Sequence, residues 1–275
     1  PIIKGVLNKN GKKAVVFASE SNVLDSLGAE TIRDVMPGEL IIIDKEGNEM
    51  SYKTKIEKTH RPCIFEYIYF AHPSSVIDSE SVSHFREKLG CELADEIIKQ
   101  GINADYVIPV PSSSYNSALS LSQKTGIPYA LGITRNNYVG RSFIENNQKK
   151  RQASINEKLF IDKRYVDGKK IIIVDDSIVR GTTSKKVVSL LKKFNAKEIT
   201  FLSASPPIKN PCVYGIDMSI DKELIASEKN IEEIRKYIGA DRLIYLPLEN
   251  LLEIFGKPMC NACFSGNYPT KITPE

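Results

Sequence analysis

Short apolar runs alternate with amphipathic segments along most of this 275-residue chain. Residues 171–174 form an apolar run rich in β-branched side chains and without polar alternation, which predicts a strand buried on both faces. Residues 185–195 carry apolar side chains at helical spacing, which predicts a helix directly after that strand. A buried strand, a short loop and a helix in this order indicate an α/β fold with a mainly parallel sheet flanked by helices.

The same patterns predict further elements. Residues 79–100 place apolar side chains on one face and end before Gly101, which predicts a long helix. We also predict strands at 64–70, 106–110, 127–131 and 199–203 and helices at 118–124 and 231–237. The first 60 residues look β-rich, with strand-like runs at 14–18 and 40–43 separated by turn signals. We therefore predict two domains, residues 1–60 and residues 61–275.

The loop after the run 171–174 carries the most specific chemistry. It reads Asp175-Asp176-Ser177-Ile178-Val179-Arg180-Gly181-Thr182-Thr183-Ser184. Backbone N–H groups and hydroxyls that open a helix at the carboxyl end of a parallel strand can bind a phosphate, and a glycine permits close approach. Two carboxylates beside a phosphate would repel it, so we expect them to face sugar hydroxyls or a metal-bound group, at a strand end and outside the core. An ordinary turn with an Asp N-cap is the alternative, but it requires only one acidic residue.

This segment resembles the phosphoribosyl pyrophosphate (PRPP) motif of the type I phosphoribosyltransferases, and within them it is similar to the amidophosphoribosyltransferases. The resemblance implies the type I phosphoribosyltransferase fold. It implies that Asp175 and Asp176 meet the ribose hydroxyls near a Mg²⁺ ion and that the loop holds the 5-phosphate. On this resemblance the substrate-binding residues of the loop are Ser177, Arg180, Gly181, Thr182, Thr183 and Ser184.

Two other segments match the same family. Pro111, Ser112, Ser113 and Ser114 follow the predicted strand 106–110 and match the loop that binds pyrophosphate. The polar stretch 134–158 matches a mobile lid, which implies catalytic roles for Arg135, Tyr138 and Arg141 beside Asp175 and Asp176; a solvated basic loop is the alternative. The chain departs from the family pattern at Arg135, Asn137, Ser112 and Asn156, and these departures bear on PRPP affinity and on any nucleotide site.

The resemblance implies a reaction in which ammonia displaces pyrophosphate from C1 of the ribose of PRPP. The product is 5-phosphoribosylamine, and the reaction is the first committed step of de novo purine biosynthesis. Catalysis would consist mainly of positioning and charge stabilisation, with Mg²⁺ bridging pyrophosphate and ribose hydroxyls. A PRPP-binding sensor without turnover and a nucleobase phosphoribosyltransferase are the alternatives. The sensor should carry a DNA-binding segment, and the nucleobase enzyme should carry a base-binding hood; neither is recognisable in the sequence.

Four of the five cysteines form a candidate metal site. Cys260 and Cys263 are a C-x-x-C pair, which alone fits zinc, a redox dithiol or an iron–sulfur cluster. Cys63 and Cys212 each follow a proline. Together the four match the ligands of the [4Fe-4S] cluster in one branch of the amidophosphoribosyltransferases, with structural Zn²⁺ as the alternative. Cys91 lies inside the predicted long helix, where we expect an ordinary helix residue.

The charge balance and the length of the apolar runs limit the kinds of binding partner that we expect. Thirty-eight Lys and Arg against 34 Asp and Glu give a net charge of +4 without a basic tail. This balance suits a small anionic substrate and gives little support for nucleic-acid binding. No apolar run approaches the roughly 20 residues that span a bilayer, so we expect a cytoplasmic protein without a membrane partner. The family resemblance implies a homo-oligomer and purine nucleotide inhibitors.

The first 60 residues resemble the end of the family's N-terminal glutaminase domain, which has an Ntn-hydrolase-like fold. The matching segments are Ala18-Ser19-Glu20-Ser21, Leu24-Asp25, Gly28-Ala29, Arg33-Asp34-Val35 and Pro37-Gly38-Glu39. The nucleophilic cysteine that this domain carries at its mature N-terminus is absent together with most of the domain, and Pro1 cannot replace it. We therefore expect a separate glutaminase chain that supplies ammonia from glutamine and covers exposed sheet edges; a fragment that has lost this part is the alternative.

Overall fold

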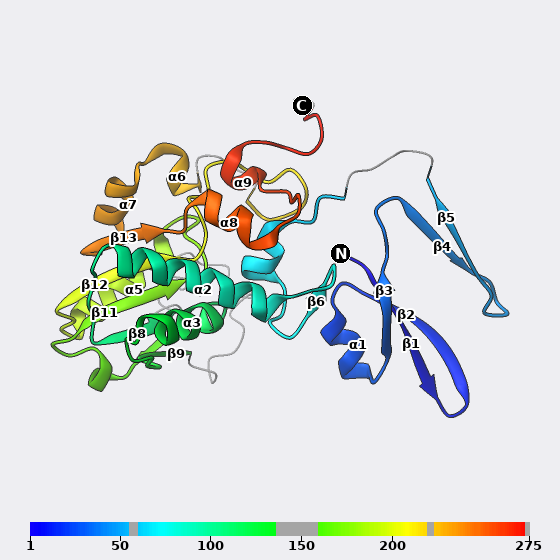
Figure 1. Ribbon diagram of the computed structural model, residues 1–275, viewed down its shortest axis with the longest axis horizontal. Helices are drawn as coiled ribbons and strands as arrows, with labels where there is room; N and C mark the ends of the chain where they lie inside the picture. Colours follow the sequence, from blue (N-terminus) through cyan, green and yellow to red (C-terminus); the bar gives the residue numbers. More distant parts are fainter. Residues whose placement is uncertain (55–59, 136–158, 219–222, 273–275) are drawn as a thin grey trace, which may run out of the picture. The chain divides into compact units, whose positions relative to one another are not determined.

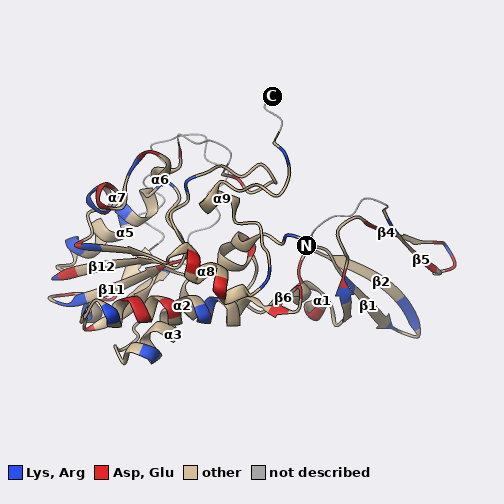
Figure 2. Ribbon diagram, turned by 45° about the horizontal axis from the view of Figure 1, so that its top comes forward, with Lys and Arg blue, Asp and Glu red and all other residues tan. Residues whose placement is uncertain are grey.

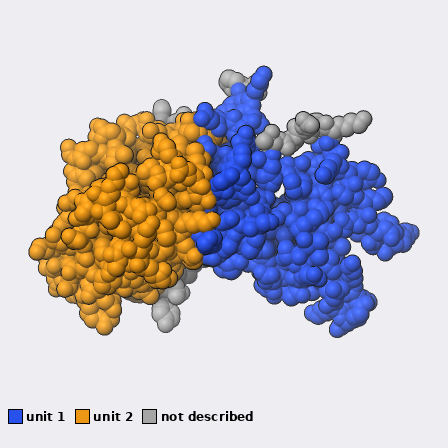
Figure 3. Space-filling model, in the orientation of Figure 1, with its two compact units in different colours: residues 1–85, 255–261, 267–275 blue, residues 86–254, 262–266 orange. Residues whose placement is uncertain are grey.

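The computed structural model describes residues 1–54, 60–135, 159–218 and 223–272, and the chain divides into two compact units. Unit 1 comprises residues 1–85, 255–261 and 267–275, and unit 2 comprises residues 86–254 and 262–266 (Figure 3). Figure 1 gives the element labels used below. The domain boundary predicted at residue 60 stays a prediction.

A four-stranded parallel sheet forms the centre of unit 2 (Figure 1). Its strand order is β13 (Arg242–Tyr245), β12 (Glu198–Ser203), β11 (Lys170–Asp175), β8 (Tyr106–Pro109). Residues 171–174 are fully buried within β11, as the unbroken apolar run predicts. The predicted α/β fold, a parallel sheet flanked by helices, is confirmed.

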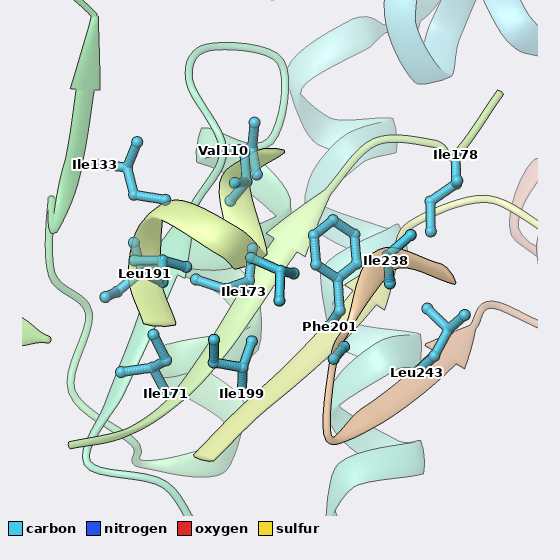
Figure 4. Close-up of a cluster of buried hydrophobic side chains, with 14 of the residues drawn as sticks. Val110, Ile133, Ile171, Ile173, Ile178, Leu191, Ile199, Phe201, Ile238 and Leu243 are labelled. Carbon is cyan, nitrogen blue, oxygen red and sulfur yellow. The ribbon is translucent and has the colours of Figure 1, made fainter. Parts of the chain in front are cut away.

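Alternate residues of the strands build one hydrophobic core (Figure 4). Ile171 and Ile173 of β11 lie on the same face of the sheet as Phe201 of β12, because strand side chains alternate with a period of two. Helices α5 (Thr182–Lys193) and α7 (Ile231–Ile238) add Leu191 and Ile238 to this cluster. These two helices therefore cover that face of the sheet.

Helices α2 (Val82–Lys99) and α3 (Tyr115–Thr125) contact each other closely in unit 2. Ser117 Oγ donates to the carbonyl oxygen of Arg86 at 2.8 Å. A Cβ at Gly90 would overlap the carbonyl oxygen of Ser117, so only glycine permits this approach of the two backbones. The helix predicted from residue 79 begins at Val82, because residues 80–81 belong to a short hairpin of β6 (Val76–Ile77) and β7 (Glu80–Ser81).

The strand predicted at residues 64–70 is wrong. Residues 66–70 form a π-helix, η1 (Glu66–Phe70), in unit 1. Tyr67 and Ile68 are buried whereas Tyr69 and Phe70 are about half exposed, so burial follows a helical repeat. A short apolar run does not distinguish a strand from a buried helical turn.

The strand predicted at residues 127–131 is also wrong. Tyr129 forms only an isolated parallel bridge with Val107. Pro128 accepts a hydrogen bond from Val107 N at 2.9 Å through its carbonyl oxygen but has no N–H to donate, which limits ladder formation. The strands predicted at 106–110 and 199–203 and the helices predicted at 118–124, 185–195 and 231–237 are confirmed within a few residues at their ends.

The predicted strand-rich N-terminal region is confirmed. An antiparallel sheet has the order β2 (Lys12–Ala18), β1 (Ile3–Lys9), β3 (Glu30–Asp34). Helix α1 (Ser21–Leu27) places Leu24 in a small core with Ile3 and Ala29. A separate hairpin pairs β4 (Glu39–Ile43) with β5 (Glu49–Lys53).

The remaining elements are β9 (Ile133–Arg135), β10 (Leu159–Ile161), η2 (Lys163–Tyr165), α6 (Ile225–Glu228), α8 (Leu248–Phe255) and α9 (Ala262–Ser265).

Positively and negatively charged residues are both found among the helices of unit 2 (Figure 2). This distribution agrees with the small net charge of +4. Among the residues that the structure describes, no helix combines the length and the apolar character needed to cross a membrane.

Candidate functional site

Two of the predicted site segments meet at the carboxyl ends of β8 and β11. These strands are neighbours in the sheet, and Val110 N donates to Val174 O at 2.8 Å where they end. The pyrophosphate loop, defined here as residues 110–114, therefore starts beside the phosphate loop, defined as residues 177–184. Ser113 Oγ donates a hydrogen bond to Asp176 Oδ2 and joins the first loop to the acidic pair.

The acidic pair lies at the end of β11, as predicted, but its side chains are buried rather than outside the core. Asp175 is 6% exposed and Asp176 is 7% exposed. Asp176 Oδ1 accepts a hydrogen bond from Ser177 Oγ at 2.6 Å, and Asp176 N donates to Asp175 Oδ1 at 3.0 Å. Polar groups of the two loops thus cover the carboxylates, which the sequence pattern does not reveal.

Burial dominates the electrostatics of this pair. It raises the pKa of Asp175 well above its ordinary value, and the neighbouring charge of Asp176 raises that pKa further. Burial also raises the pKa of Asp176, against the hydrogen bonds from Ser113 and Ser177 and the charge of Arg86, which lower it. Hydroxyl donors or a cation from a ligand would favour the charged form of both groups.

Arg86 lies at the site although it is not among the residues predicted from the sequence. It lies on α2, is 1% exposed, and its guanidinium lowers the pKa of Asp176. The sequence could have indicated that Arg86 is buried. Position 86 is four residues after Val82 and seven before Leu93, which places it on the apolar face of the helix. A buried arginine on such a face normally has an acidic partner.

The pyrophosphate loop also contributes hydrogen-bonding groups next to the acidic pair. The peptide bond between Pro111 and Ser112 is cis, and Ser112 is exposed. Ser114 Oγ is buried and, within the described residues, has no partner at hydrogen-bond geometry, although it is near enough to Asp175 to lower the pKa of that carboxyl. A buried hydroxyl without a full partner is available to a ligand.

The phosphate loop ends at the N-terminus of α5. Gly181 is the N-cap residue with φ of 71°, a left-handed conformation that favours glycine. The N–H groups of the first helical turn, which include those of Thr182 and Thr183, have no partner within the helix and lie at its positive end. Both threonines are exposed, whereas Ser184 is buried. This geometry can bind an anion.

Arg180 makes an ion pair with Glu223, and both side chains are about half exposed. Arg180 is among the residues predicted to bind substrate, and that role stays a prediction. Glu223 follows the segment 219–222, which lies outside the described residues.

The lid residues are only partly described. Tyr138, Arg141, Asn137 and Asn156 lie outside the described residues. Arg135 is exposed at the end of β9 and pairs with Leu159 of the antiparallel β10, so the two ends of this segment lie together. Among the residues that are described, Arg135 has no hydrogen bond or ion pair with the acidic pair.

Two of the predicted metal-ligating cysteines lie together in unit 1. Cys63 and Cys260 form a parallel bridge in which Cys260 N donates to Pro62 O at 2.8 Å. Burial raises the pKa of the Cys63 thiol to about 11, and the neighbouring Cys260 contributes to this increase. A bound metal would replace the thiol proton, so this pair fits thiolate ligation.

The other two cysteines belong to unit 2. The carbonyl oxygen of Cys263 accepts hydrogen bonds from Lys209 N and Asn210 N at 2.9 and 3.0 Å, close in sequence to Cys212. Across the described ranges, no group of three or more His, Cys, Asp or Glu residues is arranged to hold a metal ion. Cys91 is a half-buried residue of α2.

Known proteins match this chain over most of its sequence. The phosphoribosyl transferase domain family matches residues 83–223. The amidophosphoribosyltransferase of Bacillus subtilis is 44% identical over 266 residues, which cover 94% of this chain and 55% of that protein. The amidophosphoribosyltransferase of Methanothermobacter thermautotrophicus is 42% identical over 264 residues, which also cover 94% of this chain and 55% of that protein. The chain thus spans about half the length of these relatives.

A solved structure extends the similarity to the fold. Glutamine PRPP amidotransferase from B. subtilis, complexed with ADP and GMP, matches with a TM-score of 0.88 and 43% identity over 99% of this chain and 60% of that chain. The resemblance seen in the sequence is therefore confirmed. The chain belongs to the phosphoribosyltransferase family, and over nearly its whole length it is homologous to the amidophosphoribosyltransferases.

Proposed function

We propose that this chain carries out the synthase reaction of an amidophosphoribosyltransferase. Ammonia would attack C1 of PRPP, the bond from C1 to pyrophosphate would break, and 5-phosphoribosylamine would form for de novo purine biosynthesis. The observation that carries the proposal is the hydrogen-bonded meeting of Ser113 and Asp176, which joins two ligand-binding loops at the ends of adjacent parallel strands. Homology to amidophosphoribosyltransferases supports the same reaction.

Each part of the site has a role in this proposal. Asp175 and Asp176 accept hydrogen bonds from the ribose hydroxyls, and amides at the N-terminus of α5 hold the 5-phosphate. The pyrophosphate loop binds the leaving group through its amides and through Ser114 Oγ. Catalysis then rests on alignment of ammonia with C1 and on stabilisation of the departing charge. Arg135, Tyr138 and Arg141 are proposed to act from the lid.

Asp175 and Asp176 fit a substrate-bound Mg²⁺ ion, because a nearby cation would favour the charged forms that burial opposes. Mg²⁺ keeps several waters and needs few protein ligands when phosphate oxygens are present. When bound, the ion would neutralise charge on the pyrophosphate leaving group.

We also propose that Cys63, Cys212, Cys260 and Cys263 ligate a [4Fe-4S] cluster, with Zn²⁺ as the alternative. The pairing of Cys63 with Cys260 supports this assignment. Since PRPP displacement requires no electron transfer, the cluster would have a structural role.

The remaining proposals concern regulation and partners. Because the B. subtilis enzyme was solved with ADP and GMP, we propose that purine nucleotides also bind and inhibit this chain. Glutamine would be the source of ammonia through a glutaminase part, to which residues 1–60 would contribute as the end of that domain, while residues 61–275 would form the phosphoribosyltransferase domain. A separate glutaminase chain, a homo-oligomer and a cytoplasmic location stay predictions.

Pyrophosphate release from PRPP with ammonium as the only nitrogen donor tests the proposal. Asp176→Asn should lower turnover by roughly 100-fold or more, because it weakens charge stabilisation at the reacting sugar. Asp167→Asn is the matched control, since Asp167 is an exposed carboxylate of the same unit that accepts a hydrogen bond from Asn195. PRPP binding without release would favour the sensor, and release that requires a nucleobase would favour the nucleobase enzyme.

A further inference from the structure

Three residues of the phosphate loop, Ile178, Val179 and Gly181, contact α6 or α7. Ile178 and Ile238 belong to the same buried core cluster (Figure 4). Ile225 belongs to this cluster too. The carbonyl oxygen of Val179 accepts a hydrogen bond from Ile225 N at 2.9 Å. A Cβ at Gly181 would lie 2.8 Å from Ile225 Cδ1, so the loop backbone at Gly181 packs closely against the side chain of Ile225.

Charged groups extend this contact at the surface. The Arg180 guanidinium pairs with Glu223, one residue before the N-cap of α6. Lys185 Nζ lies 4.5 Å from the ring centroid of Tyr237 on α7. Every residue from 178 to 181 is therefore bound to the α6 and α7 region by packing, by a backbone hydrogen bond or by an ion pair.

We propose that Glu223 is a positioning residue for the phosphate loop and acts through Arg180. The inference rests on the proposed function, because the ligand that the loop would hold is the 5-phosphate of PRPP. Amides bind an anion well only when the loop that carries them is already ordered. With Glu223 as its partner, the Arg180 guanidinium fixes the loop from outside, and the phosphate is left to the amides at the start of α5.

The alternative is that Arg180 binds the phosphate directly and Glu223 competes with it. The two arrangements differ in what loss of the Glu223 charge does. If Glu223 positions the loop, Glu223→Gln loosens the loop and weakens binding. If Glu223 competes, the same substitution frees Arg180 and strengthens binding.

Hydrogen–deuterium exchange of the unliganded full chain tests loop order without any ligand. Glu223→Gln should speed exchange of amides 178–184 by about two- to fivefold, the range that loss of one exposed ion pair allows. The matched control is Glu232→Gln, which removes the exposed pairs of Glu232 with Arg235 and Lys236 on α7 and should leave these amides unchanged. Equal exchange in wild type and Glu223→Gln would overturn the proposal.

Steady-state kinetics with PRPP, Mg²⁺ and ammonium give the second readout. Glu223→Gln should raise KM for PRPP by about two- to fivefold and change kcat by less than twofold. The double variant Arg180→Glu with Glu223→Arg restores an ion pair and should return KM to within about twofold of wild type. Tighter PRPP binding in Glu223→Gln, or a double variant as weak as Arg180→Glu alone, would overturn the proposal.

The two proposals fail in different ways. If wild-type protein neither binds PRPP nor releases pyrophosphate, the proposed function is wrong, while the exchange comparison still decides whether Glu223 orders the loop. If wild type is active and Glu223→Gln matches it in exchange and in KM, the positioning role is wrong and the proposed function stands.

Discussion

The acidic pair shows, at the scale of single residues, how function opposes stability. Asp175 and Asp176 are buried at the end of β11, and burial raises the pKa of both. The charged carboxylates that the proposed function requires are therefore costly to the unliganded protein. Hydrogen bonds from Ser113 and Ser177 offset part of this cost at Asp176.

Asp175→Asn should stabilise the unliganded protein at pH 7 by roughly 1–2 kcal/mol, because the variant removes a buried carboxylate and keeps an acceptor for Asp176 N. The folded state binds the Asp175 proton above pH 3.8, where the unfolded state has lost it. Wild-type stability therefore falls as pH rises through the window between 3.8 and the raised pKa. The gain of the variant should grow over that window and vanish below it.

Urea unfolding of both proteins from pH 3.5 to pH 7 measures this difference. Asp167→Asn is the control, because it removes an exposed carboxylate of the same unit and leaves the buried pair intact. A variant less stable than wild type at pH 7 would show that the charged Asp175 stabilises the fold.

Among the helices and strands, the spacing of apolar residues predicted the correct element wherever the buried face of that element matches the local pattern. The unbroken apolar run of β11 and the amphipathic pattern of α5 each predicted the observed element. The predictions at 64–70 and 127–131 were wrong because local pattern did not decide these segments. Residues 66–70 wind into a π-helix whose Tyr67 packs against Phe85 and Phe255, and residue 129 makes a single bridge beside Pro128.

Gly90→Ala should lower the free energy of unfolding by about 2–3 kcal/mol, because its methyl group would overlap the Ser117 carbonyl and force α2 and α3 apart. Thermal or urea unfolding measures the change. Ile98→Ala on an exposed position of the same helix is the control and should stay within about 0.5 kcal/mol of wild type. An unchanged stability in Gly90→Ala would show that the two helices can separate at little cost.

At the scale of the whole molecule, the cysteines connect distant parts of the sequence. Cys63 and Cys260 are almost 200 residues apart, yet their backbones form a bridge in unit 1. This contact supports the assignment of both cysteines as ligands of one metal centre. The sequence around either cysteine alone does not show that the two lie together.

Cys260→Ser should abolish bound iron and lower the thermal stability of anaerobically purified protein, because a cluster ligand is lost. Cys91→Ser, in α2, is the matched control and should retain both iron and stability. Iron content, zinc content and visible absorbance are the measurements. Zinc in place of iron would support the alternative metal, and a stable Cys260→Ser protein with unchanged metal content would contradict the assignment.

Local sequence patterns were sufficient to predict strand β11, the position of the acidic pair at its end, and the loop and helix that follow, because a buried apolar run and a glycine–hydroxyl loop have strong physical requirements. The sequence also contained the family resemblance that the comparisons confirm. The contact of Ser113 with Asp176, the place of Arg86 near that carboxylate and the pairing of Glu223 with Arg180 became known from the folded structure alone. These contacts join residues from 43 to 90 positions apart, and their formation depends on the order of the neighbouring strands and helices, which no local pattern specifies.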